Sequence, residues 1–260
     1  MKIINGKKIA HRILEDLKKE IKKQKIKPRL AVILVGHNPA SCLYVKIKEK
    51  VGQSIGIEIE KHFLSSKTKE WEIINIIDTL NNNNKINGIL VQLPLPQGLS
   101  TDRIIKEISI KKDVDGFLSE SRFESPFILA IYEAIKATGE DLKNKKIIAL
   151  VNSDIFGKKL ESKLGAKYVI GSSSLAFRMT KQADILITAL GCPGIIKGDM
   201  IKKDVILIDG GISKIDDKII GDIDAENVKD KAKWLSPVPG GLGPLTVAFL
   251  MKNVIEANKI

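Results

Sequence analysis

The sequence has few of the residues that build metal centres and disulfide frameworks. Its two cysteines, Cys42 and Cys192, are far apart along a chain of 260 residues. Its three histidines, His11, His37 and His62, are scattered without the spacing of metal ligands. Small disulfide-stapled domains and zinc modules need several such residues at short intervals. We therefore predict no metal site, and the cysteine usage suits the reducing cytoplasm, where we expect the protein to act.

Long apolar runs are also missing. No stretch of the sequence approaches the roughly 20 consecutive apolar residues that cross a bilayer. The beginning of the chain, MKIINGKKIAHRILEDLKKE, places charge in every helical turn and has no apolar core segment, which predicts no signal peptide. We expect a protein without a membrane partner.

Aromatic residues make up only 5% of the chain and arginines are few, although the formal net charge is +12. The positive excess is almost all lysine, spread over helical stretches such as residues 17–27, with no aromatic side chains interleaved for stacking on bases. We therefore predict no nucleic-acid partner. The alternative in that class, a non-catalytic basic RNA-binding protein, would be recognised by a steep salt dependence of binding.

What the chain does have is a regular alternation of apolar runs and amphipathic stretches. We expect strands at residues 30–35, 57–64, 88–93, 146–151, 167–170, 185–188 and 205–208, and helices at 41–54, 70–80, 101–108 and 245–257. Such alternation predicts an α/β protein with parallel sheets. We place a first domain at residues 1–118 and a second at 119–244, with a C-terminal helix within 245–260 packing back on the first.

Two stretches in the first half have the character of a site. Tyr44 and Lys48 are four residues apart, so a helix puts them on one face, next to the end of a strand. On spacing alone, a surface Tyr–Lys pair is the commoner outcome. Gln92 lies in the apolar strand 88–93, so its amide is either bonded to backbone or directed into a site.

Two stretches in the second half have a similar character. Residues 237–246, PVPGGLGPLT, form either an elaborate turn or a rigid loop whose N–H groups approach a ligand. Residues 145–166, KKIIALVNSDIFGKKLESKLGA, read as a strand, a turn and a helix, as in a nucleotide-binding unit. The turn has a single glycine, Gly157, so it is a damaged site, a variant one, or a turn that never held a nucleotide.

Taken together, these stretches resemble the bifunctional methylenetetrahydrofolate dehydrogenase/methenyltetrahydrofolate cyclohydrolase family. The resemblance covers nearly the whole chain, through the motifs VGHNPAS (35–41), YVxxK (44–48), GILVQLPLP (88–96), KDVDGF (112–117), GxPG (191–194) and PVPGGLGPLT (237–246). Enzymes of this family oxidise 5,10-methylenetetrahydrofolate with NADP to the methenyl form and hydrolyse that to 10-formyltetrahydrofolate. The resemblance implies a folate domain, a Rossmann-like NADP-binding domain and a homodimer.

The resemblance also implies roles for residues of the first domain. Lys48 would be the base in hydrolysis, with a pKa lowered by burial or by the positive charge of the substrate. Tyr44 would stack or hydrogen-bond at the pterin, and Gln92 would orient Lys48. Asp115 would accept hydrogen bonds from the amino and ring N–H groups of the pterin.

Further positions follow from the same resemblance. The substrate crevice would be lined by Pro237, Gly240 and Gly241, and the many lysines suit the polyglutamate tail of folates. The cofactor-binding positions would be Val151, Asn152, Ser153, Gly157, Ser173, Ile212 and Thr246.

The chain departs from the family pattern at the cofactor turn. The family's Gly-x-Ser-x-x-Val-Gly-x-Pro has Val151 in place of the first glycine and Lys159 in place of the proline. Asn152 stands where an arginine is usual, which leaves Lys158 or Ser173 to contact the 2′-phosphate. A side chain at Val151 is expected to crowd the backbone approach to the pyrophosphate.

A second departure is the short link between the domains. The family has a longer segment here, near substrate and nicotinamide, ending Pro-Cys-Thr-Pro-x-Gly, and only residues 125–126 match it. We therefore expect intact hydrolysis with weakened NADP binding and an impaired dehydrogenase half. The alternative is a cyclohydrolase whose nucleotide domain has become structural.

Overall fold

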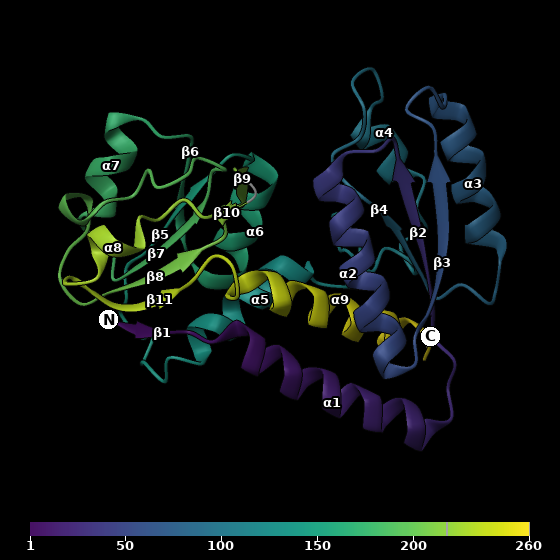
Figure 1. Cartoon of the computed structure of the whole chain (residues 1–260), viewed down its shortest axis with the longest axis horizontal. Helices are drawn as coiled ribbons and strands as arrows, with labels where there is room; N and C mark the ends of the chain where they lie inside the picture. Colours follow the sequence, from purple (N-terminus) through teal and green to yellow (C-terminus); the bar gives the residue numbers. More distant parts are fainter. Residues whose placement is uncertain (217, 260) are drawn as a thin grey trace. The chain divides into compact units, whose positions relative to one another are not determined.

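The chain forms two compact units. The computed structural model describes residues 1–216 and 218–259, which Figure 1 traces in sequence order. Unit 1 comprises Met1–Ala10 and Phe127–Thr246, and unit 2 comprises His11–Pro126 and the chain from Val247 onward. Each unit is built on a parallel sheet with helices between its strands, so the predicted α/β class is confirmed.

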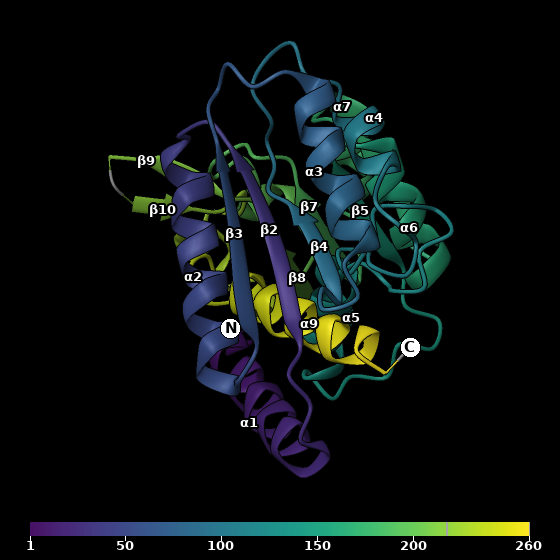
Figure 2. The same ribbon diagram turned by 90° about the vertical axis from the view of Figure 1, so that its right-hand side faces the viewer.

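Unit 2 is built on a three-stranded parallel sheet of order β3-β2-β4. The central strand β2 (Arg29–Val35) pairs with β3 (Glu58–Leu64) on one side and with β4 (Gly88–Val91) on the other. Its side chains alternate between two apolar clusters, one containing α2 (Pro39–Ile55) and the other α3 (Glu70–Asn82). Figure 2 shows these two helices on opposite sides of the sheet. Coverage of both faces explains the uninterrupted apolar sequence of β2.

Helix α2 carries two of the predicted site residues, and local chemistry fixes its ends. The Asn38 side chain accepts a hydrogen bond from a backbone N–H of the first turn, and Pro39 occupies the start of the helix. The helix ends at Gly56, whose φ of 99° lies in the left-handed region that glycine favours. Tyr44 and Lys48 are four residues apart within this helix, so their side chains lie on one face.

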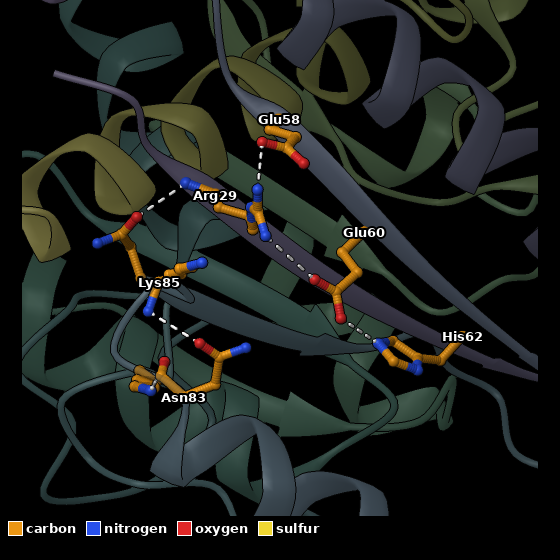
Figure 3. Close-up of polar contacts among 8 residues, drawn as sticks. Arg29, Glu58, Glu60, His62, Asn83 and Lys85 are labelled. Atoms are coloured by element: carbon orange, nitrogen blue, oxygen red, sulfur yellow. Dashed lines mark hydrogen bonds and ion pairs between the residues drawn. The ribbon is translucent and has the colours of Figure 1, made fainter. Parts of the chain in front are cut away.

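A row of polar side chains follows β3 from its first residue (Figure 3). Arg29 Nη2 lies 2.6 Å from Glu58 Oε2, Arg29 Nη1 lies 3.7 Å from Glu60 Oε2, and Glu60 Oε1 lies 2.9 Å from His62 Nε2. Such partly exposed pairs contribute about 0–1 kcal/mol each. The row begins at Arg29, the first residue of β2, and runs along β3 to His62, which is paired with Ile33 of β2.

Unit 1 is built on a six-stranded parallel sheet of order β1-β11-β8-β7-β5-β6. Its strands are β1 (Lys2–Ile3), β5 (Ile147–Val151), β6 (Lys167–Ile170), β7 (Ile185–Ala189), β8 (Val205–Asp209) and β11 (Ala232–Ser236). The chain passes from β5 to β6 on one side and then to β7 on the other, so the strand order reverses at β5. Parallel α/β sheets bind nucleotides at such a switch point.

Short helices and one hairpin complete this part of the chain. They are α5 (Pro126–Lys136), α6 (Asp154–Leu164), α7 (Ser174–Thr180), a 3-10 turn at Gly198–Met200, the antiparallel pair β9 (Ser213–Ile215) and β10 (Lys218–Ile220), and α8 (Ala225–Val228). Helix α4 (Thr101–Lys106) belongs to unit 2.

The first residues of the chain cluster with unit 1, which differs from the domain boundary placed at residues 1–118. Strand β1 pairs in parallel with β11, with Lys2 opposite Trp234. Helix α1 (Gly6–Gln24) then begins in unit 1 and continues into unit 2. A strand of two residues has no apolar pattern of its own, and its partner lies too far along the chain for local sequence to indicate it.

The last helix, α9 (Leu242–Ala257), supplies much of the core of unit 2. Its second half packs in one apolar cluster with side chains of α1, α2 and β2; the α9 members are Val247, Leu250, Met251, Val254, Ile255 and Ala257. The prediction that the C-terminal helix packs on the first domain is therefore confirmed.

Candidate active site

Lys48 and Gln92 form the centre of a polar site in unit 2. Lys48 Nζ donates a hydrogen bond to Gln92 Oε1 at 2.9 Å, which joins α2 to the residue following β4. Gln92 Nε2 in turn donates to the carbonyl oxygen of Leu93 at 2.8 Å. Because the amide nitrogen is engaged by this carbonyl, the oxygen is the end presented to the lysine. Of the two alternatives left open for Gln92, bonding to backbone is observed; its amide oxygen also accepts from Lys48, and its direction into a site stays a prediction.

The surroundings of Lys48 lower the pKa of its ammonium group. Burial lowers the pKa of the Lys48 ammonium, and the negative charge of Asp115 partly opposes this shift. Tyr44 lies one helical turn earlier, and burial raises the pKa of its phenol. A lysine with a lowered pKa has a larger neutral fraction near pH 7, so it is better able to accept a proton.

Asp115 lies in a tightly folded loop that follows α4. The buried carboxylate of Asp113 accepts hydrogen bonds from the backbone N–H groups of Phe117 at 3.2 Å and Leu118 at 2.9 Å. Gly116 has a φ of 63°, and a Cβ there would lie 2.6 Å from a backbone oxygen of the same loop. The KDVDGF motif therefore fixes the backbone on both sides of Asp115, which is itself partly exposed.

The turn at the switch point of unit 1 differs from expectation at Val151. This residue ends β5 and is fully buried, so its side chain does not stand over the turn. The backbone N–H of Asn152 donates to the carbonyl of Ala189 at 3.1 Å, and the Ser153 side chain caps α6. The burial of Val151 does not favour the expected crowding of the pyrophosphate, which stays a prediction.

An acidic residue, Asp154, occupies the first turn of α6. Its carboxylate accepts from the Tyr168 hydroxyl at 2.7 Å and lies 2.7 Å from Lys158 Nζ. The hydrogen bond from Lys158 is the main cause of a lowered pKa of Asp154, and the bond from Tyr168 lowers it further. The carboxyl group is therefore ionised at neutral pH. Helix N-termini favour anions such as phosphate. Here the protein's own carboxylate occupies the first turn, and Lys158, a candidate to replace the arginine, is paired with it.

The remaining positions predicted to bind the cofactor are dispersed over unit 1. A Cβ on Gly157 would lie 2.2 Å from the ring of Tyr168, so this glycine permits close packing of α6 against β6. The Ser173 hydroxyl caps α7, and Thr246 Oγ1 donates at 3.0 Å to a carbonyl one turn earlier in α9. Ile212 follows β8 and is 46% exposed.

The Pro-Gly loop is anchored on the start of α1. Gly241 N–H donates to the Pro237 carbonyl at 2.7 Å, and Lys7 N–H donates to the Gly240 carbonyl at 3.2 Å. A Cβ on Gly6 would lie 1.8 Å from the Gly241 oxygen, so a glycine is required there. The loop is a compact turn within unit 1, and its contact with substrate stays a prediction.

Sequence reasoning missed two buried carboxylates that hold the loop after β7. Asp222 accepts from the backbone N–H groups of Leu190 and Cys192, each at 2.7 Å, and Asp209 accepts from the Asp222 N–H at 3.0 Å. Burial raises the pKa of Asp209 to about 6 and also raises that of Asp222. These residues shape the loop that carries the GxPG motif. Isolated buried acids leave no periodic signal in a sequence.

Residues 1–216 and 218–259 contain neither a cluster of metal ligands nor a membrane-spanning helix. No three or more His, Cys, Asp or Glu side chains gather there in a way that could hold a metal ion. Over the same ranges, no helix combines the length and the apolar character needed to span a membrane.

Comparison with known proteins accounts for nearly the whole chain. Residues 4–115 match the tetrahydrofolate dehydrogenase/cyclohydrolase catalytic domain, and residues 127–260 match the NAD(P)-binding domain of the same family. The bifunctional protein FolD of Halothermothrix orenii is 41% identical over 278 residues, covering 99% of this chain and 98% of that protein.

Solved structures give the same result. The bifunctional FolD methylenetetrahydrofolate dehydrogenase/cyclohydrolase of Campylobacter jejuni has a TM-score of 0.93 at 35% identity, covering 100% of this chain and 99% of that one. The Trypanosoma brucei enzyme, solved with NADP cofactor and inhibitor, has a TM-score of 0.94 at 25% identity, covering 99% and 97%.

The matched catalytic and NAD(P)-binding domains, in this order and over this length, define a two-domain α/β enzyme. The chain belongs to the tetrahydrofolate dehydrogenase/cyclohydrolase family. The resemblance found in its motifs is thereby confirmed.

Proposed function

We propose that the protein acts in one-carbon folate metabolism as a methylenetetrahydrofolate dehydrogenase and methenyltetrahydrofolate cyclohydrolase, with hydrolysis as its stronger activity. Family membership supports the substrate class. The observation that carries the hydrolytic assignment is the 2.9 Å hydrogen bond between Lys48 and Gln92, with the pKa of the lysine lowered by burial.

In hydrolysis, Lys48 is the group that takes a proton. Water adds to the methenyl carbon and loses one proton to neutral Lys48. The bond from that carbon to N5 then breaks, the remaining hydroxyl proton leaves as the formyl C=O forms, and N5 takes up one proton to give the 10-formyl product. Lys48 afterwards releases its proton to solvent. The hydrogen bond to Gln92 fixes the position of Nζ while leaving its lone pair for the water. The cationic substrate beside Lys48 lowers the pKa of the ammonium further, which keeps the base neutral at the moment it is needed.

Recognition of the pterin falls to Asp115 and Tyr44. The Asp115 carboxylate accepts hydrogen bonds from the amino and ring N–H groups of the pterin, and Tyr44 contacts the ring. On the family resemblance, Pro237, Gly240 and Gly241 contact the substrate from their loop. The lysine excess favours folates with a polyglutamate tail.

For oxidation, NADP supplies the hydride acceptor when it is bound. The residues that would hold it are those of the switch-point turn, Val151, Asn152, Ser153 and Gly157, with Ser173, Ile212 and Thr246. The N-terminus of α6 suits a pyrophosphate. At the 2′-phosphate, however, neutral Asn152 offers no guanidinium fork, and ionised Asp154 adds repulsion.

NADP binding is therefore weakened and hydride transfer is slow in this proposal. The pairing of Lys158 with Asp154 at 2.7 Å also supports a second candidate function. In that case the protein is a cyclohydrolase whose nucleotide-binding unit serves only as structure.

The deciding experiment has two parts. NADP and NAD are each titrated into the protein by calorimetry, and methenyl formation and its hydrolysis are then followed by absorbance. We expect efficient hydrolysis, weak NADP binding and slow or absent hydride transfer. Tight NADP binding with brisk dehydrogenation would refute the separation of the two activities, whereas absence of hydrolysis would refute the proposal as a whole.

Asp115→Ala tests the shared pterin pocket. We expect folate binding to weaken by about 1.5–3 kcal/mol, the usual range for a hydrogen bond to a charged group. Binding and both activities are measured on the same preparation. Because both reactions use one pocket, a change confined to one activity would contradict the model.

Assembly and location complete the proposal. We infer a homodimer from the family resemblance, and light scattering of the purified protein tests it. Cys42 and Cys192 are both free thiols, which supports the cytoplasm as the site of action.

A further inference from the structure

A polar residue of the C-terminal helix lies inside the apolar core of unit 2. Asn253 of α9 is 3% exposed, and its neighbours Val254 and Ile255 are fully buried among apolar side chains. An amide in such surroundings is costly unless its hydrogen-bonding groups have partners. The question is therefore what Asn253 holds.

Its partners are the two arms of the loop that carries Asp115. Asn253 Nδ2 donates to the carbonyl of Val114 at 2.8 Å and to the carbonyl of Glu124 at 3.0 Å. Val114 directly precedes Asp115 in the chain. One side chain thus bridges the residue before the pterin carboxylate and the end of the same loop, across 139 residues of sequence.

The bridge adds to the contacts within the loop that hold the backbone around Asp115. Asp113 fixes the backbone that follows, through Phe117 and Leu118, and Gly116 provides the left-handed turn. On the near side, the Val114 N–H donates to the Lys112 carbonyl at 2.9 Å, and Asn253 holds the Val114 carbonyl. The carbonyl of Val114 belongs to the peptide group that joins it to Asp115, so its direction sets how the Asp115 side chain leaves the backbone.

We propose that Asn253 is a positioning residue for the folate site, which orients Asp115 toward the pterin by holding the Val114 carbonyl. The inference rests on the proposed function, since it takes Asp115 as the group that binds the pterin. It makes the C-terminal helix part of substrate recognition, and it leaves the Lys48–Gln92 pair, on other elements, to determine turnover.

The test compares three variants. Asn253→Leu removes both donors at similar volume, Asn253→Ser keeps one donor, and Val254→Ala loosens the packing of the same helix while leaving the amide in place. For each variant, KM and kcat of methenyltetrahydrofolate hydrolysis, the Kd of folic acid and the melting temperature are measured. A double-mutant cycle with Asp115→Ala then measures coupling.

We expect Asn253→Leu to raise KM and the folic acid Kd about fivefold to tenfold, with kcat within about twofold, and Asn253→Ser to have a smaller effect. Val254→Ala lowers the melting temperature but leaves KM within about twofold. In the Asp115→Ala background the Asn253 substitution changes Kd by less than about twofold, because the group that it orients is gone.

Several results would overturn the inference. Asn253 would serve only stability if Asn253→Leu had the wild-type KM. The same conclusion would follow if the two effects on Kd multiplied in the double variant, or if Val254→Ala raised KM equally. Failure of both Asn253 variants to fold would show the same. Failure of the proposed function is distinguishable, since in that case the wild-type protein does not hydrolyse the substrate or Asp115→Ala has no effect.

Discussion

At the scale of single residues, the hydrolytic proposal depends on the amine of Lys48, which Lys48→Met removes at nearly constant length. We expect hydrolysis to fall by at least about 100-fold, the lower end of general-base contributions. Folic acid binding should change little, because the shape of the pocket survives. Lys46→Met on the same helix is the matched control, since that side chain is exposed. Undiminished hydrolysis in Lys48→Met would remove the lysine from the mechanism.

Asp209 predicts a pH dependence of stability. Its pKa in the folded protein is about 6, above the ordinary value of 3.8, so between these values the folded state binds more protons than the unfolded one. Stability from this residue is therefore present at pH 4 and is lost as the pH rises through about 6. The shift corresponds to roughly 3 kcal/mol.

Asp209→Asn removes that titration. Relative to wild type, the variant should gain up to about 3 kcal/mol in unfolding free energy between pH 4 and pH 7, as measured by urea unfolding at several pH values. Asp222, whose pKa is also raised, contributes in the same direction in both proteins and largely cancels. A difference between the two proteins that is constant with pH would contradict the assigned pKa.

At the scale of elements, the β5–α6 turn allows two effects on NADP binding to be tested apart: the lack of an arginine at Asn152 and crowding by the Val151 side chain. Asn152→Arg places a guanidinium at the exposed position next to the turn, and we expect NADP to bind about tenfold more tightly. NAD, which lacks the 2′-phosphate, is the matched ligand control and should bind as before. Equal tightening of both cofactors, measured by calorimetry, would show that the 2′-phosphate is not what the new side chain contacts.

Val151→Gly should act differently from the substitution at Asn152. Because Val151 is fully buried at the end of β5, the change removes a core side chain and adds backbone freedom, at a cost of roughly 2–4 kcal/mol. We expect a lower melting temperature without tighter NADP binding. A gain in NADP affinity from Val151→Gly alone would restore the crowding argument.

The helices and strands also show which parts of the fold could be predicted from the sequence. The strand at 30–35 was predictable because it is a continuous apolar run, and the helix at 70–80 because its apolar residues recur with the helical period. Strand β11 was missed because its sequence, AKWLS, is short and has neither a continuous apolar run nor a regular alternation, and because it pairs with β1 at the other end of the chain.

The same limit applies to the site. Lys48 and Gln92 could be predicted because family motifs carry them, and the structure joins them directly. Asp222 and Asn253 are isolated polar residues whose partners are distant backbone groups, so no local pattern marks them. Burial of Val151 likewise depends on the sheet around β5 and not on its sequence neighbours.

At the scale of the whole molecule, the net charge of +12 predicts an interaction that is unrelated to catalysis. At low ionic strength the protein should bind RNA weakly and without sequence preference, and this binding should disappear at about 0.15 M salt, where the Debye length is about 8 Å. A fluorescent oligonucleotide and the hydrolysis assay, run in parallel, test this. RNA binding that persists at that salt concentration and inhibits hydrolysis would favour the RNA-binding alternative.

The interleaving of the two units sets the order in which they are completed during synthesis. The partner of β1 in unit 1 is β11, at residues 232–236, and the core of unit 2 includes α9 residues up to Ala257. Unit 1 therefore lacks a strand partner until residues 232–236 have been made, and unit 2 lacks part of its core until α9 has been made. Domains of a nascent chain usually fold one after another from the N-terminus. Here residues 11–126 lack the α9 part of their core until synthesis has passed Ala257, so we expect neither unit to complete its packing before nearly all of the other has been made.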